Sequence, residues 1–275
     1  MFFLHLFLYV SVIVIMVAQF FNHNYENVFL CLLTLVLFTL PAAIEKKLRI
    51  RFPSTMEVVI LLFIYAAEVL GEIHSMYTRV PAWDTILHAL NGFLMAAIGF
   101  SLVELLNRND SSRMQLSPVY LAIVAFCFSM TIGVCWEFLE FGSDYLFQTD
   151  MQKDTLLTKI SSVSLNPEGL NRTVVVSDIE HVVIRYSQNG EVLLTDGYLD
   201  IGLYDTMEDL FVNFIGAGIF SIIGYFHISS KGRDRKGRLA EKFIPKVYGR
   251  GNPPERIEKD IDKKKTLSYN SHKWQ

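Results

Sequence analysis

The stretch "WDTILHALNG", residues 83–92, places Asp84 and His88 four residues apart in a strongly apolar part of the chain. A spacing of four puts both side chains on one face of a helix. An aspartate and a histidine so arranged can be two ligands of one metal ion, or a base with the carboxylate that orients it. This pair is the first candidate for chemistry.

Three further segments repeat this pattern of polar residues at helical spacing. Charged groups inside a bilayer are costly and normally face other helices or a wet cavity, so each stripe is a functional candidate. Any one of these residues alone is equally expected to touch interfacial water or to pair with a neighbour. The stripes are Glu68 and Glu72 in "AAEVLGEIHS", Glu137, Glu140 and Asp144 in "CWEFLEFGSDY", and Asp205, Asp209 and Asn213 in "YDTMEDLFVNFIGAG".

The rest of the sequence predicts that membrane helices carry these stripes. The chain has 275 residues, of which 51% are hydrophobic, and it contains several apolar runs of about 20 residues, long enough to cross a bilayer. Six spans are predicted at 2–21, 26–44, 55–74, 83–106, 118–147 and 206–229. All three cysteines fall within these spans, where they predict packing rather than a disulfide or a thiolate metal site.

The predicted fold is an all-α polytopic membrane protein, with about six transmembrane helices in a bundle and a small β-rich extracytoplasmic insert. Residues 1–147 hold the first five spans, 148–204 the insert, 205–229 the sixth span and 230–275 a basic tail. Within the insert, "RTVVVS", "EHVVIRYS" and "EVLLT" are rich in β-branched residues, and Asn189-Gly190 indicates a hairpin turn. The main interpretation of the tail is a solvated segment that fixes topology. Alternatively, residues 231–243 suit a basic helix on anionic lipid, and 249–268 are typical of a disordered segment.

Basic residues in the loops predict the orientation. The loops 45–51 and 107–115 are basic, and the tail after residue 230 holds 14 of the 25 Lys and Arg residues. Such loops stay in the cytoplasm during insertion. Both termini are therefore expected on the cytoplasmic side of the membrane, with the acidic insert outside. All four polar stripes then lie in the outer half of the membrane.

Because the stripes share this depth, one outward-facing polar site is predicted. Its carboxylates and single imidazole suit a divalent cation such as Zn, Mg or Mn, with Asp84, His88, Glu137, Glu140 and Asp209 as ligands. His88, Asp84 and Glu137 are the candidate catalytic residues. Without a metal, some of these carboxyl groups would hold protons and serve as acids or bases. Glu68, Glu72, Asp144, Asp205 and Asn213 complete the predicted cluster.

Small and aromatic residues near the stripes have structural interpretations. Gly92, Gly133, Gly216 and Gly218 are expected where helices approach closely. Trp136 suits either the membrane interface or the wall of the site.

The three motifs also resemble, in order and spacing, those of the YjdF-like bacterial inner-membrane proteins. The resemblance covers the third to the sixth span and implies a multi-span membrane fold, without an established activity. A looser similarity to VanZ-like proteins departs in spacing and in the large insert. The shared positions of the YjdF-like motifs are Asp84, His88, Gly92, Glu137, Glu140, Asp205, Asp209 and Gly216.

Three functions remain open from the sequence. The first is a metal-dependent or acid-base enzyme at the outer leaflet, acting on a lipid-linked or envelope substrate. The second is a proton- or cation-coupled transporter, and the third is a structural or partner-binding membrane protein. Membrane lipid is the expected partner in each case, and nucleic acid is not expected, because no aromatic-lined basic fold presents the basic residues.

Overall fold

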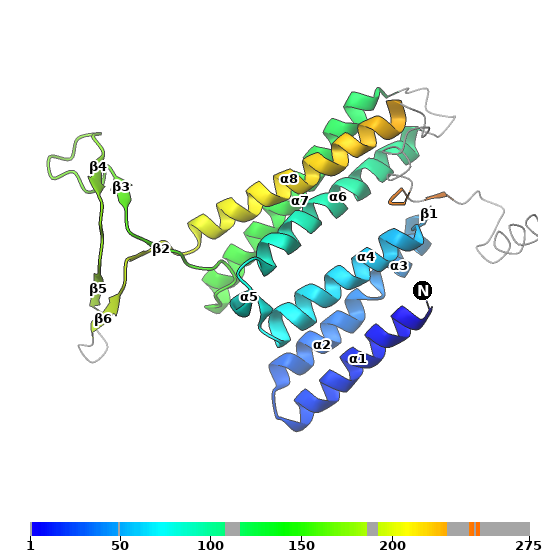
Figure 1. The fold of residues 1–275 in the computed structure, drawn as a ribbon, viewed down its shortest axis with the longest axis horizontal. Helices are drawn as coiled ribbons and strands as arrows, with labels where there is room; N and C mark the ends of the chain where they lie inside the picture. The colour runs from blue at the N-terminus through cyan, green and yellow to red at the C-terminus, as the bar shows by residue number, and fades with distance from the viewer. Residues whose placement is uncertain are drawn as a thin grey trace, which may run out of the picture.

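The computed structural model describes residues 2–48, 50–107, 116–185, 192–229, 242–244 and 246–247. Helices dominate these residues, and they form two neighbouring groups with short strand pairs at either end (Figure 1).

The first group, called here the α6–α8 group, consists of α6 (Trp83–Asn107), α7 (Pro118–Phe147) and α8 (Leu203–Ser229), which lie side by side (Figure 1). The start of α7 follows from its sequence, because the Ser117 hydroxyl accepts the Tyr120 backbone N–H at 3.2 Å and Pro118 opens the helix. The buried core of the group includes Ala96, Ala97, Phe100, Leu121, Ala125, Ala217 and Phe220.

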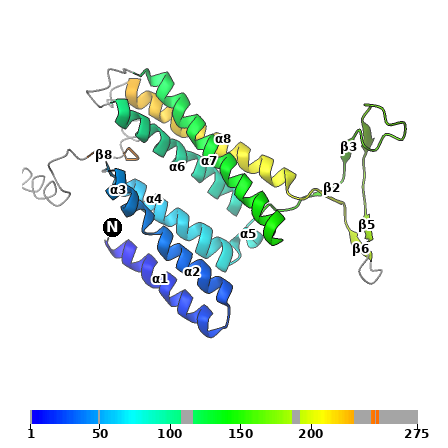
Figure 2. The same ribbon diagram turned by 180° about the vertical axis from the view of Figure 1, so that it is seen from behind.

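The second group contains α1 (Phe2–Phe21), α2 (Tyr25–Leu37), α4 (Ser54–Ile64) and η1 (Tyr65–Ile73), a π-helical segment that continues α4. The view from behind shows the same two groups (Figure 2). A separate core joins the helices of the second group, formed by Leu8, Val12, Cys31, Phe38, Leu61 and Val69. The short α5 (Met76–Arg79) leads from η1 to α6.

Five helical segments are long and apolar enough to cross a membrane: Phe3–Phe21, Tyr25–Lys47, Trp83–Glu104, Pro118–Phe147 and Leu203–Ser229. They correspond to five of the six predicted spans. The remaining prediction, 55–74, falls on α4 and η1, which have 11 and 9 residues. The change from α-helical to π-helical hydrogen bonding divides this segment, and the predicted count of six is not confirmed.

The second predicted span is also divided, into α2 and α3 (Leu40–Leu48). The turn between them lies at Phe38 and Thr39, just before Pro41. Proline has no backbone N–H to donate to the preceding turn, so a break is expected there.

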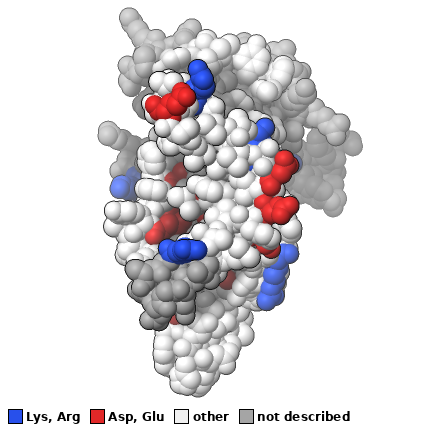
Figure 3. Space-filling model, turned by 90° about the vertical axis from the view of Figure 1, so that its left-hand side faces the viewer, with Lys and Arg blue, Asp and Glu red and all other residues white. Residues whose placement is uncertain are grey.

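The predicted β-rich insert consists of small antiparallel strand pairs beyond the ends of α7 and α8 (Figure 1). The predicted hairpin partners are present, because β5 (Val182–Arg185) pairs with β6 (Val192–Thr195). The Asn189-Gly190 turn lies outside the described residues. The other pairs are β2 (Leu156–Leu157) with β7 (Tyr198–Leu199), and β3 (Ile160–Ser162) with β4 (Val174–Val176). Viewed from the insert end of the molecule, acidic and basic side chains lie scattered on the described surface (Figure 3).

A short segment of the predicted polar tail belongs to the fold instead. Lys246–Val247, strand β8, pairs with β1 (Ile50–Arg51), at the end of the molecule opposite the insert. Just before it, the Phe243 ring lies 5.2 Å from that of Phe93, and Ile244 is buried in the core of the α6–α8 group. The predicted basic helix of 231–243, except its last two residues, and the predicted disordered segment 249–268 lie outside the described residues.

Candidate functional site

Glycines allow α6 and α8 to approach each other closely where the polar stripes begin. A Cβ atom on Gly92 would collide with the backbone carbonyl of Asn213, and one on Gly216 with that of Ala89. Gly133 on α7 faces the Asn213 amide, and a Cβ atom added to Gly133 would lie 2.7 Å from the amide nitrogen. These three predicted contacts are confirmed. The prediction for Gly218 is wrong, because that residue faces open space rather than a neighbouring helix.

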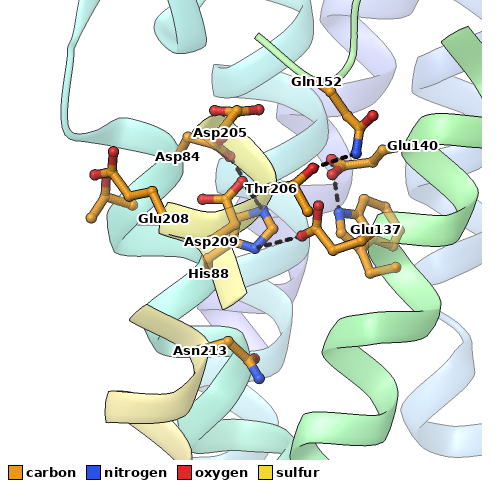
Figure 4. A network of polar contacts seen from close by, with 12 residues as sticks. Asp84, His88, Glu137, Glu140, Gln152, Asp205, Thr206, Glu208, Asp209 and Asn213 are labelled. Carbon is orange, nitrogen blue, oxygen red and sulfur yellow. Dashed lines mark hydrogen bonds and ion pairs between the residues drawn. The ribbon is translucent and has the colours of Figure 1, made fainter. Parts of the chain in front are cut away.

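His88 occupies the centre of the polar cluster (Figure 4). Its Nε2 atom lies 3.5 Å from Asp84 Oδ1 and 3.6 Å from Asp209 Oδ2. Its Nδ1 atom lies 3.9 Å from Glu137 Oε1. The imidazole is 8% exposed and Asp209 is 3% exposed. Three helices thus supply carboxylates to one buried imidazole, as the shared depth and face of the stripes predict.

Glu140 completes the buried side of the cluster on α7. The Trp136 indole N–H donates to Glu140 Oε1 at 2.9 Å, so that Trp136 belongs to the site itself. Glu137 lies one turn before Glu140, and both are buried. The spacing of three residues places the two carboxyl groups on the same face of α7.

The beginning of the insert is attached to the helix ends beside the cluster. Asp144 accepts hydrogen bonds from the backbone N–H groups of Met151 and Gln152 at 2.7 and 2.9 Å, which folds this segment over the end of α7. The Gln152 amide then donates to Thr206 Oγ1 at 2.6 Å, and the Lys153 backbone N–H donates to Asp205 Oδ2 at 2.7 Å. The insert is therefore attached to the first turn of α8.

The insert is held a second time at Asp200, just before α8 begins. Its carboxylate accepts the backbone N–H groups of Thr155 at 2.7 Å and Tyr204 at 2.8 Å. Burial opposes ionisation of Asp200, but these hydrogen bonds and one from Gly202 hold its pKa below the ordinary value. Gly202 itself has φ +85°, and a Cβ there would lie 2.6 Å from Gln152 Cβ.

Asn213 forms a polar layer below the cluster, toward the middle of the helices (Figure 4). It is 1% exposed, and its Oδ1 atom accepts a long hydrogen bond of 3.5 Å from Asn91. On the neighbouring helix, Ser129 donates to the Gly92 carbonyl at 2.8 Å. These contacts join α6, α7 and α8, which is consistent with Asn213 as a helix-joining residue rather than a ligand.

The cluster contains two sets of potential metal ligands. One ligand atom from each of His88, Glu137, Glu140 and Asp209 lies within 4.8 Å of the others, and all four residues are buried. Asp84, Asp205 and Asp209 form a second such set. Within the described part of the chain, Glu137 Oε2, Glu140 Oε2 and Asp209 Oδ2 are buried without a hydrogen-bond donor. Carboxylate oxygens in this state need a cation or a proton.

Three of the predicted carboxylates lie outside these sets. Glu68 and Glu72 are on η1 in the second helix group, where Glu68 is partly buried and Glu72 is exposed. Asp144 serves the insert, through the hydrogen bonds already described, rather than the ligand sets.

Sequence reasoning missed Tyr77, Gln152 and Thr206. Tyr77 on α5 packs against Gly71, and burial raises the pKa of its phenol, with Asp84, Glu72, Glu68 and Glu140 adding to the increase. It therefore lies between the η1 acids and the cluster. Thr206 stands within the motif "YDTMED" and could have been noticed there, whereas no pattern marked Tyr77 or Gln152.

Two further buried polar residues were also missed. Glu104 and His227 are 4% and 7% exposed, near the ends of α6 and α8 that lie far from the insert. Apolar residues that include Phe100 and Phe220 pack between these two residues and the His88 cluster along the helices.

The fold and the site together define a membrane protein with several apolar helices and a buried centre of carboxylates and histidine. Residues 3–230 match the family described as "Predicted membrane protein (DUF2238)", and the chain belongs to this family. The YjdF-like proteins fall within it, so the resemblance of the motifs is confirmed at the level of the family. The similarity to VanZ-like proteins is not shown. No curated protein and no solved structure matches the chain.

Proposed function

We propose that this protein is a divalent-metal-dependent hydrolytic enzyme that works at the outer leaflet of a bacterial inner membrane, on a lipid or lipid-linked envelope substrate. The observation that carries the proposal is the buried set of His88, Glu137, Glu140 and Asp209, whose ligand atoms lie within 4.8 Å of one another. One nitrogen and three oxygen donors suit Zn or Mn, and the carboxylates suit Mg.

Electrostatics support a cation in this set. Three carboxyl groups and one imidazole lie together in the protein interior, where uncompensated charge is unfavourable. In the described residues, no Lys or Arg side chain forms an ion pair with any of them. A divalent ion would offset this charge and give the unpaired oxygens of Glu137, Glu140 and Asp209 a partner.

A bound metal would supply Lewis acidity and a water activated at neutral pH. Asp84 is placed to bind or orient groups at the open edge of the site. Its side chain is 28% exposed, and it lies 3.5 Å from His88 Nε2, at the outer edge of the cluster. A substrate held by lipid would reach this edge between the helices, next to the joint with the insert.

The transporter alternative has less support. The core of the α6–α8 group below Asn213 contains Ala96, Phe100 and Phe220, each fully buried. This packing is mainly apolar, and the buried hydroxyls of Ser101 and Ser221 interrupt it between the His88 cluster and the Glu104 and His227 region. A continuous ion path would need further polar groups or water there.

The proposal is tested by metal analysis of the detergent-purified protein, comparing wild type with His88→Ala and Glu137→Gln. Thermal unfolding and gel filtration check that the variants fold. Glu208→Gln is the matched control, because Glu208 lies on α8 beside the cluster but contacts Thr85, at 3.4 Å, and belongs to neither ligand set. Metal in wild type and in the control, lost from both cluster variants, is the expected result.

The same preparations are then assayed for hydrolysis of lipid esters and lipid phosphates in vesicles, with and without chelator. If wild type hydrolyses a lipid, and both chelator and His88→Ala abolish this hydrolysis, the proposed metal-dependent activity is supported. A folded wild type without metal would contradict the proposal and direct attention to proton or cation flux in vesicles. If the protein binds metal but hydrolyses no envelope lipid, the metal site is supported and the hydrolytic activity is rejected.

A further inference from the structure

The acids of the cluster form two ligand sets that meet at one residue. The inner set is His88, Glu137, Glu140 and Asp209, and the outer set is Asp84, Asp205 and Asp209. Asp209 is common to both. A carboxylate shared in this way is the usual bridge between two metal ions, which lie about 3.5–4 Å apart in binuclear sites.

One carboxylate oxygen of the shared residue has no hydrogen-bond partner among the described residues. Asp209 is 3% exposed, and its Oδ2 atom accepts no hydrogen bond within the described part of the chain. His88 Nε2 is 3.6 Å from this oxygen, beyond hydrogen-bonding distance. The inner-set residues Glu137 and Glu140 each leave one further buried oxygen without a donor. These oxygens point to cationic ligands rather than to a finished hydrogen-bond network.

No Lys or Arg side chain of the described residues forms an ion pair with the outer set. The closest candidate is Lys153, whose backbone N–H bonds Asp205. The Lys153 ammonium, however, contacts Asp150, through the backbone carbonyl and through Oδ2 at 3.4 Å. Asp84 has His88 as its ion-pair partner. The outer set therefore keeps an excess of negative charge.

Charge balance favours two ions over one. The two sets contain five carboxylates in all. A single divalent ion would leave most of their negative charge uncompensated, whereas two would nearly neutralise it. Excess buried charge of either sign is strongly unfavourable in a low-dielectric interior.

The two positions also differ in their access to water. All residues of the inner set are buried, whereas Asp84 and Asp205 are only partly so. An ion in the inner set would be enclosed by protein ligands. An ion in the outer set would keep open positions for water or for an anionic group of the substrate.

We infer that the cluster is a binuclear divalent-cation site, with Asp209 as the bridging ligand, an enclosed inner ion and an open outer ion held by Asp84 and Asp205. This inference rests on the proposed metal-dependent function and adds to it the second ion. The site is tested with the metal ions alone, and Mn²⁺ and Zn²⁺ are the two probes.

The experiment measures the number of Mn²⁺ and Zn²⁺ ions bound per full-length protein, by equilibrium dialysis and elemental analysis. Wild type and the control Glu208→Gln are expected to bind about two equivalents. Asp205→Asn, in the outer set, and Glu140→Gln, in the inner set, should each lower the number to about one. Asp209→Asn should bind far fewer ions than wild type at both positions, because Asp209 is a ligand of both.

Electron paramagnetic resonance of the Mn²⁺-loaded wild type gives a second readout that needs no variant. Two ions about 4 Å apart give an exchange-coupled spectrum, and Asp205→Asn should convert it to that of an isolated ion. One equivalent in wild type, unchanged in Asp205→Asn and without coupling, would overturn the binuclear site while leaving the proposed function intact. No bound ion in a folded wild type would overturn both.

Discussion

At the scale of single residues, the ligand set depends on neighbours that hold it in place. Trp136 holds Glu140 through the indole hydrogen bond, and the joint around Gln152 and Asp205 fixes the outer edge. Residues that orient metal ligands commonly change metal affinity by 10–100-fold when they are removed. The cluster should therefore respond to substitutions that leave every carboxylate unchanged.

Replacing Trp136 tests this dependence. Trp136→Phe removes the donor to Glu140 Oε1 but keeps an aromatic ring, and we expect divalent-cation affinity to fall about tenfold, with the number of ions unchanged. Titration with Mn²⁺ measures the affinity. Trp83→Phe is the matched control, because the Trp83 indole N–H is buried without a hydrogen bond in the described residues. Equal affinities in the two variants would show that Trp136 does not orient Glu140.

At the scale of elements, the site exists because α6 and α8 come into close contact. Gly92 and Gly216 each face a backbone carbonyl of the opposite helix, and backbone atoms cannot move aside as a flexible side chain can. The polar side chains one or two turns away can then reach one another. The close contact between α6 and α8 therefore sets the geometry of the site.

Alanine substitutions separate close contact from general helix propensity. Gly92→Ala and Gly216→Ala should destabilise the protein by about 1–3 kcal/mol or more, because each added methyl overpacks the α6–α8 contact. Gly218→Ala, on the same helix but facing open space, should be neutral or stabilising by up to about 1 kcal/mol. Thermal unfolding in detergent measures all three. A stable Gly92→Ala variant that still binds metal would contradict the close approach.

At the scale of the whole molecule, the two ends of the helices differ in composition. The insert extends from one end, while the N-terminus and the β1–β8 pair lie at the other (Figures 1 and 2). The basic loop 45–51 lies at that second end, and such loops stay on the cytoplasmic side. The His88 cluster is near the insert end, so its proposed outward orientation depends on this topology.

Labelling with a membrane-impermeant thiol reagent tests the orientation. In a background with the three native cysteines replaced by Ala, Ser177→Cys in the insert should react in intact cells. Ser54→Cys, exposed at the start of α4, should react only after the membrane is opened. Permeabilised cells in which both sites react provide the control. The reverse pattern would place the His88 cluster on the cytoplasmic side and remove the outer leaflet as its location.

Much of this protein was predictable from its sequence, because membrane helices leave strong local signals. Long apolar runs predicted five of the spans. Spacings of three or four residues within each helix, as in Asp84–His88, Glu137–Glu140 and Asp205–Asp209, placed the polar side chains of that helix on one face. A face and a depth follow from helix geometry alone. The motifs also indicated the family.

Tertiary structure alone decided which stripes meet. Glu68 and Glu72 have the same local pattern as the ligands, yet they lie on η1 in the other helix group. Phe243 and Ile244 belong to a segment that looked like a solvated tail but packs against the α6–α8 group. Neither outcome is encoded in local periodicity, because each depends on long-range packing between segments far apart in the chain. The sharing of Asp209 between two ligand sets has the same origin, since it requires three helices at fixed distances.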